Sequence, residues 1–447
     1  PCPVAAPVAS VQPPPPTPAA GGGGGTVIAC TPSCVCPIGT VLRNGECVKT
    51  DVCPPSMTLG QNGQCQCRPH YRLIDGVCKP EILMFSPVKG CTPPTLSDEE
   101  LRKNRADCDG DALRHHFIDD YYKPRLPKFD RIDTPVFSAA NWGGMGLHTR
   151  GNFEGFMHAP AQQKWLEAHG GGHWESFYTK YGETLQKKFF GHFLKGENTG
   201  WDNQPRVLLQ VRHPDRFVER AENEWPLART QWTKYYLNPE DSSLSTVAPS
   251  VDTKIAYAAM GDGLLFLTPP FEAETEFTGP VAAKLFVSSS TRDADIFLVL
   301  RLFAPDGSEV TYRGSNDPRV PIGIGWLRAS HRKLDAAKSL PYRPWHTHDE
   351  AQPLAPNVPV ELDVEIWPTC IVVPVGYRLG LAVRGKDFAH PGPKVEIPGV
   401  MYSLTGVGPF LHTHPQDRPP EIFGGTNTLH FDAQRKPYVL LPVIPAR

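Results

Sequence analysis

A histidine follows three consecutive glycines in the stretch EAHGGGHWESFY, residues 167–178. This residue, His173, stands between an apolar, strand-like run and a segment with helical periodicity. An imidazole changes its charge near neutral pH, so a histidine in such a loop can act as a general base for a nucleophile. The alternative is a loop histidine that packs on Trp174. We therefore take His173 as the candidate catalytic residue and ask what else the chain provides.

Two further histidine pairs have a spacing that metal ligands use. They occur in WHTHDE (His346, His348, Asp349) and in LHTHPQD (His412, His414, Asp417). On a strand, an H-x-H pair places both imidazoles on one face, and four such ligands could bind zinc. Both pairs lie in turn-rich segments, which favours ordinary surface loops. We expect no metal and no cofactor.

The cysteines gather near the start of the chain, where eleven of the twelve precede residue 110 and Cys370 stands alone. Two segments repeat the pattern C-x-C-x(10)-C at an offset of 31 residues. The six repeated cysteines are Cys34, Cys36, Cys47, Cys65, Cys67 and Cys78. Zinc sites more often pair thiolates as C-x(2–4)-C, so disulfides fit better than metal or free thiols. The repeats resemble small secreted modules of the trypsin-inhibitor-like or epidermal-growth-factor-like type, which suggests a secreted or periplasmic location. The rest of the chain is also compatible with the cytoplasm, so the location stays open.

Composition narrows the class of partner. The formal net charge is −2, so no broad basic field indicates nucleic acid or an anionic membrane surface. No apolar run approaches the roughly 18 to 20 residues of a membrane span. The sequence begins at Pro1 without a recognisable signal peptide, and a removed signal and a fragment both stay open. The length allows about three domains.

The chain divides by composition into successive regions. Residues 1–29 form a Pro- and Gly-rich linker that we expect to be disordered, and residues 30–91 form the cysteine-rich repeat region. Ser97 with Glu100 three residues later predicts a helix start with a capping box. From 98 to 199 strands and helices alternate, which predicts an α/β segment.

Three elements of that segment surround His173. Apolar runs predict strands over 134–142 and 163–169. A helix is predicted over 175–196, with Phe177, Tyr181 and Phe189 on its packing face and Gly196 as its stop. Residues 200–447 instead alternate apolar and polar side chains, as in VELDVEIW (360–367) and YRLGLAVR (377–384). This pattern predicts an all-β sandwich.

Several of these motifs together resemble the X-Pro dipeptidyl-peptidase/cocaine-esterase (CocE/NonD) family of serine hydrolases. They are DTPVFSAANWGGMGLHTRGNFEGF, GGGHWESFY…KKFFGHFLKG, GWLRASHRKLD and GGTNTLHF…YVLLPVIP, and the resemblance covers residues from about 98 to 447. It implies that 98–199 is the C-terminal part of an α/β-hydrolase domain and that 200–447 is the family's jelly-roll domain, with a galactose-binding-like fold. It also implies that His173 holds the place of the triad base.

The chain departs from that family at the other catalytic positions. No G-x-S-x-G occurs, so the family's nucleophile elbow and the oxyanion donors near it are missing. Where the family carries an aspartate after a tryptophan, this chain reads Asn141-Trp142-Gly143-Gly144. Asp119, Asp120 or Glu154 could replace that acid, on sequence proximity alone.

The sequence therefore predicts a multidomain protein with a partial α/β-hydrolase segment, a jelly-roll sandwich and a cysteine-rich N-terminal region. We expect the C-terminal part of a serine hydrolase for acyl esters or X-Pro peptides, inactive alone because the nucleophile elbow is missing. Its substrate would be a small ester or peptide once a nucleophile-bearing segment completes the site. The alternative is a secreted or envelope-associated binding protein without catalysis, carried on a disulfide-rich stalk.

Overall fold

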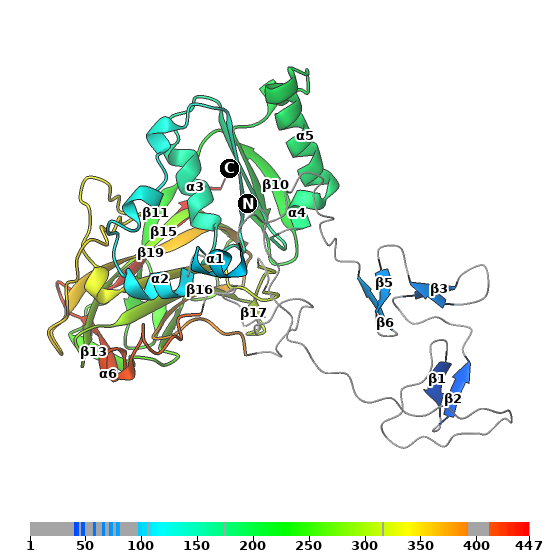
Figure 1. The fold of residues 1–447 in the computed structure, drawn as a ribbon. Coiled ribbons are helices and arrows are strands. Elements are labelled where there is room, and N and C mark those ends of the chain that lie inside the picture. The colour runs from blue at the N-terminus through cyan, green and yellow to red at the C-terminus, as the bar shows by residue number, and fades with distance from the viewer. Residues whose placement is uncertain are drawn as a thin grey trace. The chain divides into compact units, whose positions relative to one another are not determined.

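The computed structural model describes residues 40–43, 46–49, 57–59, 65–67, 71–74, 77–80, 97–104, 108–173, 175–314, 317–391 and 411–446. The chain forms two compact units, Pro1–Ala106 and Asp107–Arg447. Figure 1 shows both units and labels some of their elements.

The described residues of the first unit form three short antiparallel hairpins and a helix. They are β1 (Thr40–Arg43) with β2 (Glu46–Lys49), β3 (Met57–Leu59) with β4 (Cys65–Cys67), β5 (Tyr71–Ile74) with β6 (Val77–Pro80), and α1 (Asp98–Lys103). Thr40 pairs with Lys49 and, 31 positions later, Tyr71 pairs with Pro80. The two sequence repeats thus form hairpins with equivalent strand pairing.

Two predictions concern this unit. The capping box is confirmed, because Ser97 N–H donates to Glu100 Oε2 at 2.8 Å and Glu100 N–H donates to Ser97 Oγ at 3.3 Å. The side chains of the repeated cysteines lie outside the described residues, so the disulfide framework stays a prediction.

The second unit contains a parallel arrangement of β7 (Val136–Asn141), β8 (Lys164–His169) and β9 (Val207–Arg212). Leu166 and Leu209 pack with Phe153 and Phe156 of α3 (Thr149–His158). The neighbouring residues Trp165 and Leu208 pack with Leu185 and Phe189 of α5 (Lys180–Lys195). Since adjacent strand residues face opposite sides, α3 and α5 cover opposite faces of these strands (Figure 1). The two predicted strands are confirmed, and the observed strands are slightly shorter than the predicted ranges.

The predicted helix over 175–196 is interrupted. The chain forms α4 (Glu175–Tyr178), and then Thr179 caps α5 by accepting a hydrogen bond from Gly182 N–H. The break shifts the helical phase, so Phe177 is 55% exposed while Phe189 is buried. The packing role predicted for Phe177 was therefore wrong. Gly196 ends α5 with φ at 67°, as its sequence position predicted.

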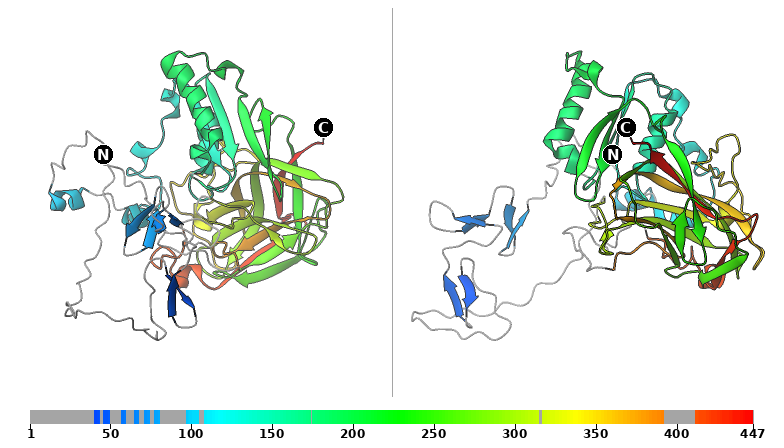
Figure 2. Two further views of the ribbon diagram at one scale, coloured as in Figure 1. Left: turned by 90° about the vertical axis from the view of Figure 1, so that its right-hand side faces the viewer. Right: turned by 180° about the vertical axis from the view of Figure 1, so that it is seen from behind.

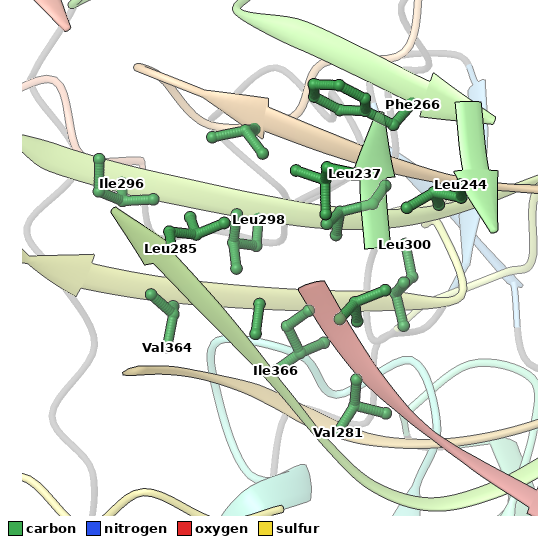
Figure 3. Packing of buried hydrophobic residues seen from close by; sticks show 14 of the residues in the cluster. Leu237, Leu244, Phe266, Val281, Leu285, Ile296, Leu298, Leu300, Val364 and Ile366 are labelled. Carbon is green, nitrogen blue, oxygen red and sulfur yellow. The ribbon is translucent and has the colours of Figure 1, made fainter. Parts of the chain in front are cut away.

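Most of the remaining strands form a closed sheet. In the order of pairing they are β15 (Thr275–Ser289), β22 (Tyr438–Ile444), β11 (Gln231–Asn238), β12 (Ser243–Ser245), β14 (Leu264–Leu267), β20 (Arg378–Arg384), β16 (Asp295–Phe303), β18 (Gly323–Arg328) and β19 (Val360–Val373). Antiparallel pairing of β19 with β15 closes the ring. Leu362, Val364 and Ile366 are buried inside it while Glu361, Asp363 and Glu365 are not, so the alternation read from the sequence is confirmed. Figure 3 shows the aliphatic packing.

Smaller elements complete this unit. They are β10 (Phe217–Glu222), β13 (Thr253–Ala258), β17 (Glu309–Val310), β21 (Thr426–Phe431), α2 (Cys108–Arg114), α6 (Pro420–Phe423) and 3₁₀ turns at Lys123–Arg125, Phe129–Arg131, Trp201–Asn203 and Ala329–His331. The helices of the described residues lack the length and apolar character needed to cross a membrane.

One strand joins the parallel strands to the closed sheet. β9 pairs with β8 and also contacts β19, where Arg212 is the partner of Ile371. The two arrangements are therefore parts of one 16-stranded sheet, and Figure 2 shows β7–β9 extending from the closed part. β9 begins shortly after residue 199, where the sequence predicted the end of the α/β segment.

Candidate active site

His173 lies in the loop that follows β8, at the carboxyl end of the parallel strands. The turn before it needs glycine, since Gly171 has φ at 79°. The His173 ring stacks on that of His148, at the start of α3, with centroids 5.1 Å apart. Burial lowers the pKa of His173, and His148 and His169 lower it further. A neutral imidazole is the form that accepts a proton, so this environment suits a general base.

A second histidine at the same strand end has a carboxylate partner. Nδ1 of His169 lies 2.8 Å from Oε2 of Glu167, which is 2% exposed, and the Tyr181 hydroxyl donates to Oε1 at 3.0 Å. Nε2 of His169 is buried and has no hydrogen-bond partner among the described residues. A carboxylate at Nδ1 fixes the orientation of the His169 ring, whose Nε2 is shielded from solvent. Sequence reasoning missed this pair, although an E-x-H spacing on a predicted strand places both side chains on one face.

The three acids proposed as triad partners contact other groups. Nδ1 of His115 lies 2.6 Å from Asp119, and Lys123 lies 3.2 Å from the exposed carboxylate of Asp120. Glu154 is buried on α3, where its Oε2 lies 2.9 Å from Nε2 of His158, one turn later. Arg343 binds both oxygens of Glu154 at 3.2 Å. The structure therefore places all three acids in other interactions and brings Glu167 to this strand end instead.

The segment after β7, where the resembling family has its acid, shows why glycine stands there. A Cβ atom on Gly143 would lie 2.3 Å from the Cα atom of Gly314, so the close approach of the backbone excludes any side chain. The neighbouring Asn141 is buried, and its Nδ2 donates to the carbonyl oxygen of Gly171 at 3.0 Å. This amide thus fixes the glycine loop that carries His173.

The two H-x-H motifs are used differently. Nδ1 of His348 lies 3.0 Å from Nδ1 of His331, and the rings of His346 and His348 are 5.7 Å apart. Nδ1 of His412 instead lies 3.0 Å from Asp387, and Nδ1 of His414 accepts from the backbone of Gln416. Within the part of the chain that the structure describes, no group of three His, Cys, Asp or Glu residues could hold a metal ion.

Comparison with known families agrees with this architecture. Residues 199–440 match the model of the X-Pro dipeptidyl-peptidase C-terminal non-catalytic domain. A CocE/NonD family hydrolase from Staphylococcus aureus has a similar structure, with a TM-score of 0.68 and 28% identity over 76% of this chain and 59% of that chain.

Two curated relatives are esterases by name. A Mycobacterium bovis protein that carries the name serine esterase is 27% identical over 245 residues, which cover 47% of this chain and 36% of that protein. The cocaine esterase of Rhodococcus sp. is 29% identical over 169 residues, or 28% of each chain. The present chain thus spans about a third of the length of the curated relatives it matches.

The chain belongs to the X-Pro dipeptidyl-peptidase/cocaine-esterase (CocE/NonD) family. This is a hydrolase family whose curated relatives reported above are esterases by name, and the part that this chain shares with the family model is the C-terminal domain of X-Pro dipeptidyl-peptidases, described as non-catalytic.

Proposed function

We propose that this chain is the histidine-bearing C-terminal part of a serine hydrolase that acts on acyl esters or X-Pro peptides, and that it does not hydrolyse them alone. One observation carries the proposal. The carboxyl end of β8 brings together His173, His169 and the Glu167 carboxylate, whereas the sequence contains no G-x-S-x-G elbow. Active sites of open α/β sheets lie at the carboxyl ends of parallel strands, which supports this assignment.

In this proposal β7, β8 and β9 with α3 and α5 are the last strands and helices of an α/β-hydrolase domain. The closed sheet is the family's jelly-roll domain. Parallel strands are usually buried on both faces and paired on both edges, and β7 pairs only with β8 among the described strands. An additional parallel strand could therefore pair with β7.

The proposed chemistry is general-base catalysis. His173 takes the proton of a serine hydroxyl that attacks the ester or peptide carbonyl, and then gives it to the leaving group. Glu167 and His169 are positioning residues in this account, because they hold the strand end beside the His173 loop. Without a nucleophile and oxyanion donors, a base alone supplies little rate enhancement.

The test is a pair of proteins assayed with p-nitrophenyl acetate and an X-Pro p-nitroanilide. The chain itself should remain at background. The second protein is a fusion in which the part of the S. aureus hydrolase that this chain does not cover is followed by residues 107–447 of this chain. The fusion should hydrolyse at least one of the two substrates. His173→Ala in the fusion should reduce that rate about 1,000-fold or more. A folded but inactive fusion, or one indifferent to His173→Ala, would contradict the proposed role of His173.

The alternative is a binding protein without catalysis. This alternative predicts that both the chain and the fusion bind ligand but do not hydrolyse the ester or the peptide. The non-catalytic description of the matched domain supports this alternative for residues 199–440.

A further inference from the structure

Residues 110–131, which we call the strap, form one wall of a cavity of about 1230 Å³ within the second unit. Among the residues that line this cavity, Ile118 and Phe129 come from the strap, whereas Trp326 and Trp367 come from strands β18 and β19. Every residue of the strap is exposed or only partly buried. A segment that buries so little has low local stability, so a few contacts decide how often it leaves its place.

Two histidines outside the strap contact its middle. The Phe117 ring stacks on that of His331, with centroids 4.7 Å apart and planes at 10°. Ile118 donates its backbone N–H to the carbonyl oxygen of His348 at 2.7 Å. His348 has φ at 48°, a left-handed conformation that is uncommon for residues other than glycine and persists where surrounding contacts fix it. The position of the strap thus depends on both histidines.

The two histidines are bonded to each other. Nδ1 of His331 lies 3.0 Å from Nδ1 of His348. Two imidazole nitrogens form this hydrogen bond only when one carries a proton and the other accepts it, so at least one ring must be neutral. If both rings are protonated, two N–H groups and two positive charges face each other and the contact becomes repulsive. Acid therefore breaks the pair.

The groups around His331 do not compensate a second charge. Arg328 faces it from β18, and His116 faces it from the strap. The neighbouring acid, Asp295, is bonded to Arg328 at 2.8 Å and to Arg418 at 2.9 Å, so its charge is already balanced. Burial of the ring, and then the neighbouring imidazole and Arg328, lower the pKa of His331 to about 4.

The surroundings of His348 are similar. Arg150 faces it from α3, and the ring of His346 lies 5.7 Å away. The neighbouring acid, Asp349, is bonded to Lys333 at 3.0 Å. Burial first and Arg150 second lower the pKa of His348. Since both rings are less basic in this structure than in water, protons favour a form in which the strap has left and water reaches them.

We propose that the strap is an acid-opened cover of the cavity, held closed at neutral pH by the His331–His348 pair. Above about pH 6.5 the pair is intact, and its contribution is lost progressively as the pH falls toward 4. Protonation of both rings releases Phe117 and Ile118 and gives solvent and ligands a wider entrance to the cavity. This device does not involve His173, so it is independent of the hydrolase activity proposed above.

Hydrogen exchange of the full chain at about pH 7.5 and about pH 5, followed by mass spectrometry, tests the proposal. Protection factors are corrected for the intrinsic pH dependence of exchange. We expect the protection of a peptide spanning residues 115–123 to fall about tenfold or more at the lower pH. One imidazole whose pKa rises from about 4 to 6.5 on opening favours the open form by up to about 30-fold at about pH 5. Peptides from β16 and β19 should keep their protection, which separates local opening from unfolding of the closed sheet.

The double variant His331→Gln with His348→Asn removes both titrating groups but keeps side chains that can hydrogen-bond each other. Asparagine suits position 348 because it tolerates a positive φ. This variant should show similar protection of residues 115–123 at both pH values. His430→Gln is the matched control, since burial lowers the pKa of His430 too, while its Nε2 lies 2.8 Å from Ser288 on β15. The control should lose strap protection at low pH as the parent chain does.

Three results would overturn the proposal. One is unchanged protection of residues 115–123 between the two pH values in the parent chain. Another is a loss of protection in the double variant as large as in the parent. If the double variant is unprotected at both pH values, His331→Gln alone decides, because it should reduce the pH dependence by about one proton. An unchanged pH dependence in that single variant is the third contradicting result.

Discussion

The parallel strands β7–β9 and the closed sheet are parts of one sheet but differ in the side chains that they bury. The closed sheet encloses aliphatic side chains such as Leu298, Leu300 and Ile366, and its strands pair on both sides around the ring. The parallel strands bury Glu167, His169 and Asn141 near their carboxyl ends. Buried polar groups cost stability unless they are paired, so their presence at one strand end is a functional signal.

Arg212 marks the boundary between the two regions. This residue is fully buried, donates to the carbonyl oxygens of Cys370 and Ile322, and bonds Thr369 Oγ1. Its bonds thus hold the end of β9 against the closed sheet. We infer that the closed sheet provides the rigid support, and that the parallel strands carry the groups able to do chemistry.

The largest effect should come from the interior of the closed sheet. Leu298→Ala removes a fully buried side chain and leaves a cavity, so the free energy of unfolding should fall by about 2–5 kcal/mol. Val218→Ala, at a 40% exposed position on β10, should change it by about 0.5 kcal/mol or less. Urea unfolding measures both. Equal effects would mean that the closed sheet does not unfold as the main cooperative core.

A smaller effect is expected at the parallel strands. Glu167→Gln weakens the buried bonds to His169 and Tyr181 and should cost about 1–3 kcal/mol of unfolding free energy. The control, Glu183→Gln, removes an exposed ion pair with Lys187 and should cost about 0.5 kcal/mol or less. Thermal unfolding compares them. If Glu167→Gln is neutral, the Glu167–His169 pair does not hold the strand end.

Two half-buried histidines, His331 and His346, predict how the free energy of unfolding depends on pH. Burial lowers the pKa of His331 and of His346 to about 4, from an ordinary value of 6.5. Between pH 6.5 and 4 the unfolded chain therefore binds protons that the folded chain does not. The free energy of unfolding should be undiminished above pH 6.5 and should fall as the pH decreases toward 4.

Replacing both residues isolates their contribution. In the double variant with His331→Gln and His346→Gln, unfolding should take up about one to two fewer protons between pH 6.5 and 4. The slope of the unfolding free energy against pH should therefore decrease by roughly 1.4 kcal/mol per pH unit for each proton. Partial exposure of the rings reduces the value. An unaltered slope in the double variant would show that these histidines titrate normally in the folded chain.

The sequence predicted those elements whose local signals agree with the fold. Strands β7 and β8, the glycine stop of α5, the capping box and the alternation along β19 all follow from periodicity and end residues. The family was also identifiable from its motifs. The break at Thr179 was not, because KYGE and ESFY continue a plausible helix and only the cap at Gly182 N–H separates them.

The site was harder to predict because its partners are set by tertiary packing. His173 could be chosen from its glycine loop, but Glu154 meets Arg343 across 189 positions of sequence, which no local pattern reveals. Glu167 was overlooked because a carboxylate inside an apolar strand was interpreted as part of the strand alone. A cavity of about 1230 Å³ in the second unit is likewise lined by side chains from α3, β18 and β19, which only the fold brings together.

We propose that this chain holds a base but no nucleophile, and incubation of the purified chain with a fluorophosphonate, followed by intact mass measurement, tests this directly. We expect no stoichiometric adduct, with the S. aureus hydrolase labelled in parallel as the positive control. One adduct per chain that a single Ser→Ala substitution removes would overturn the proposal, since the chain would then contain a nucleophile outside the G-x-S-x-G pattern.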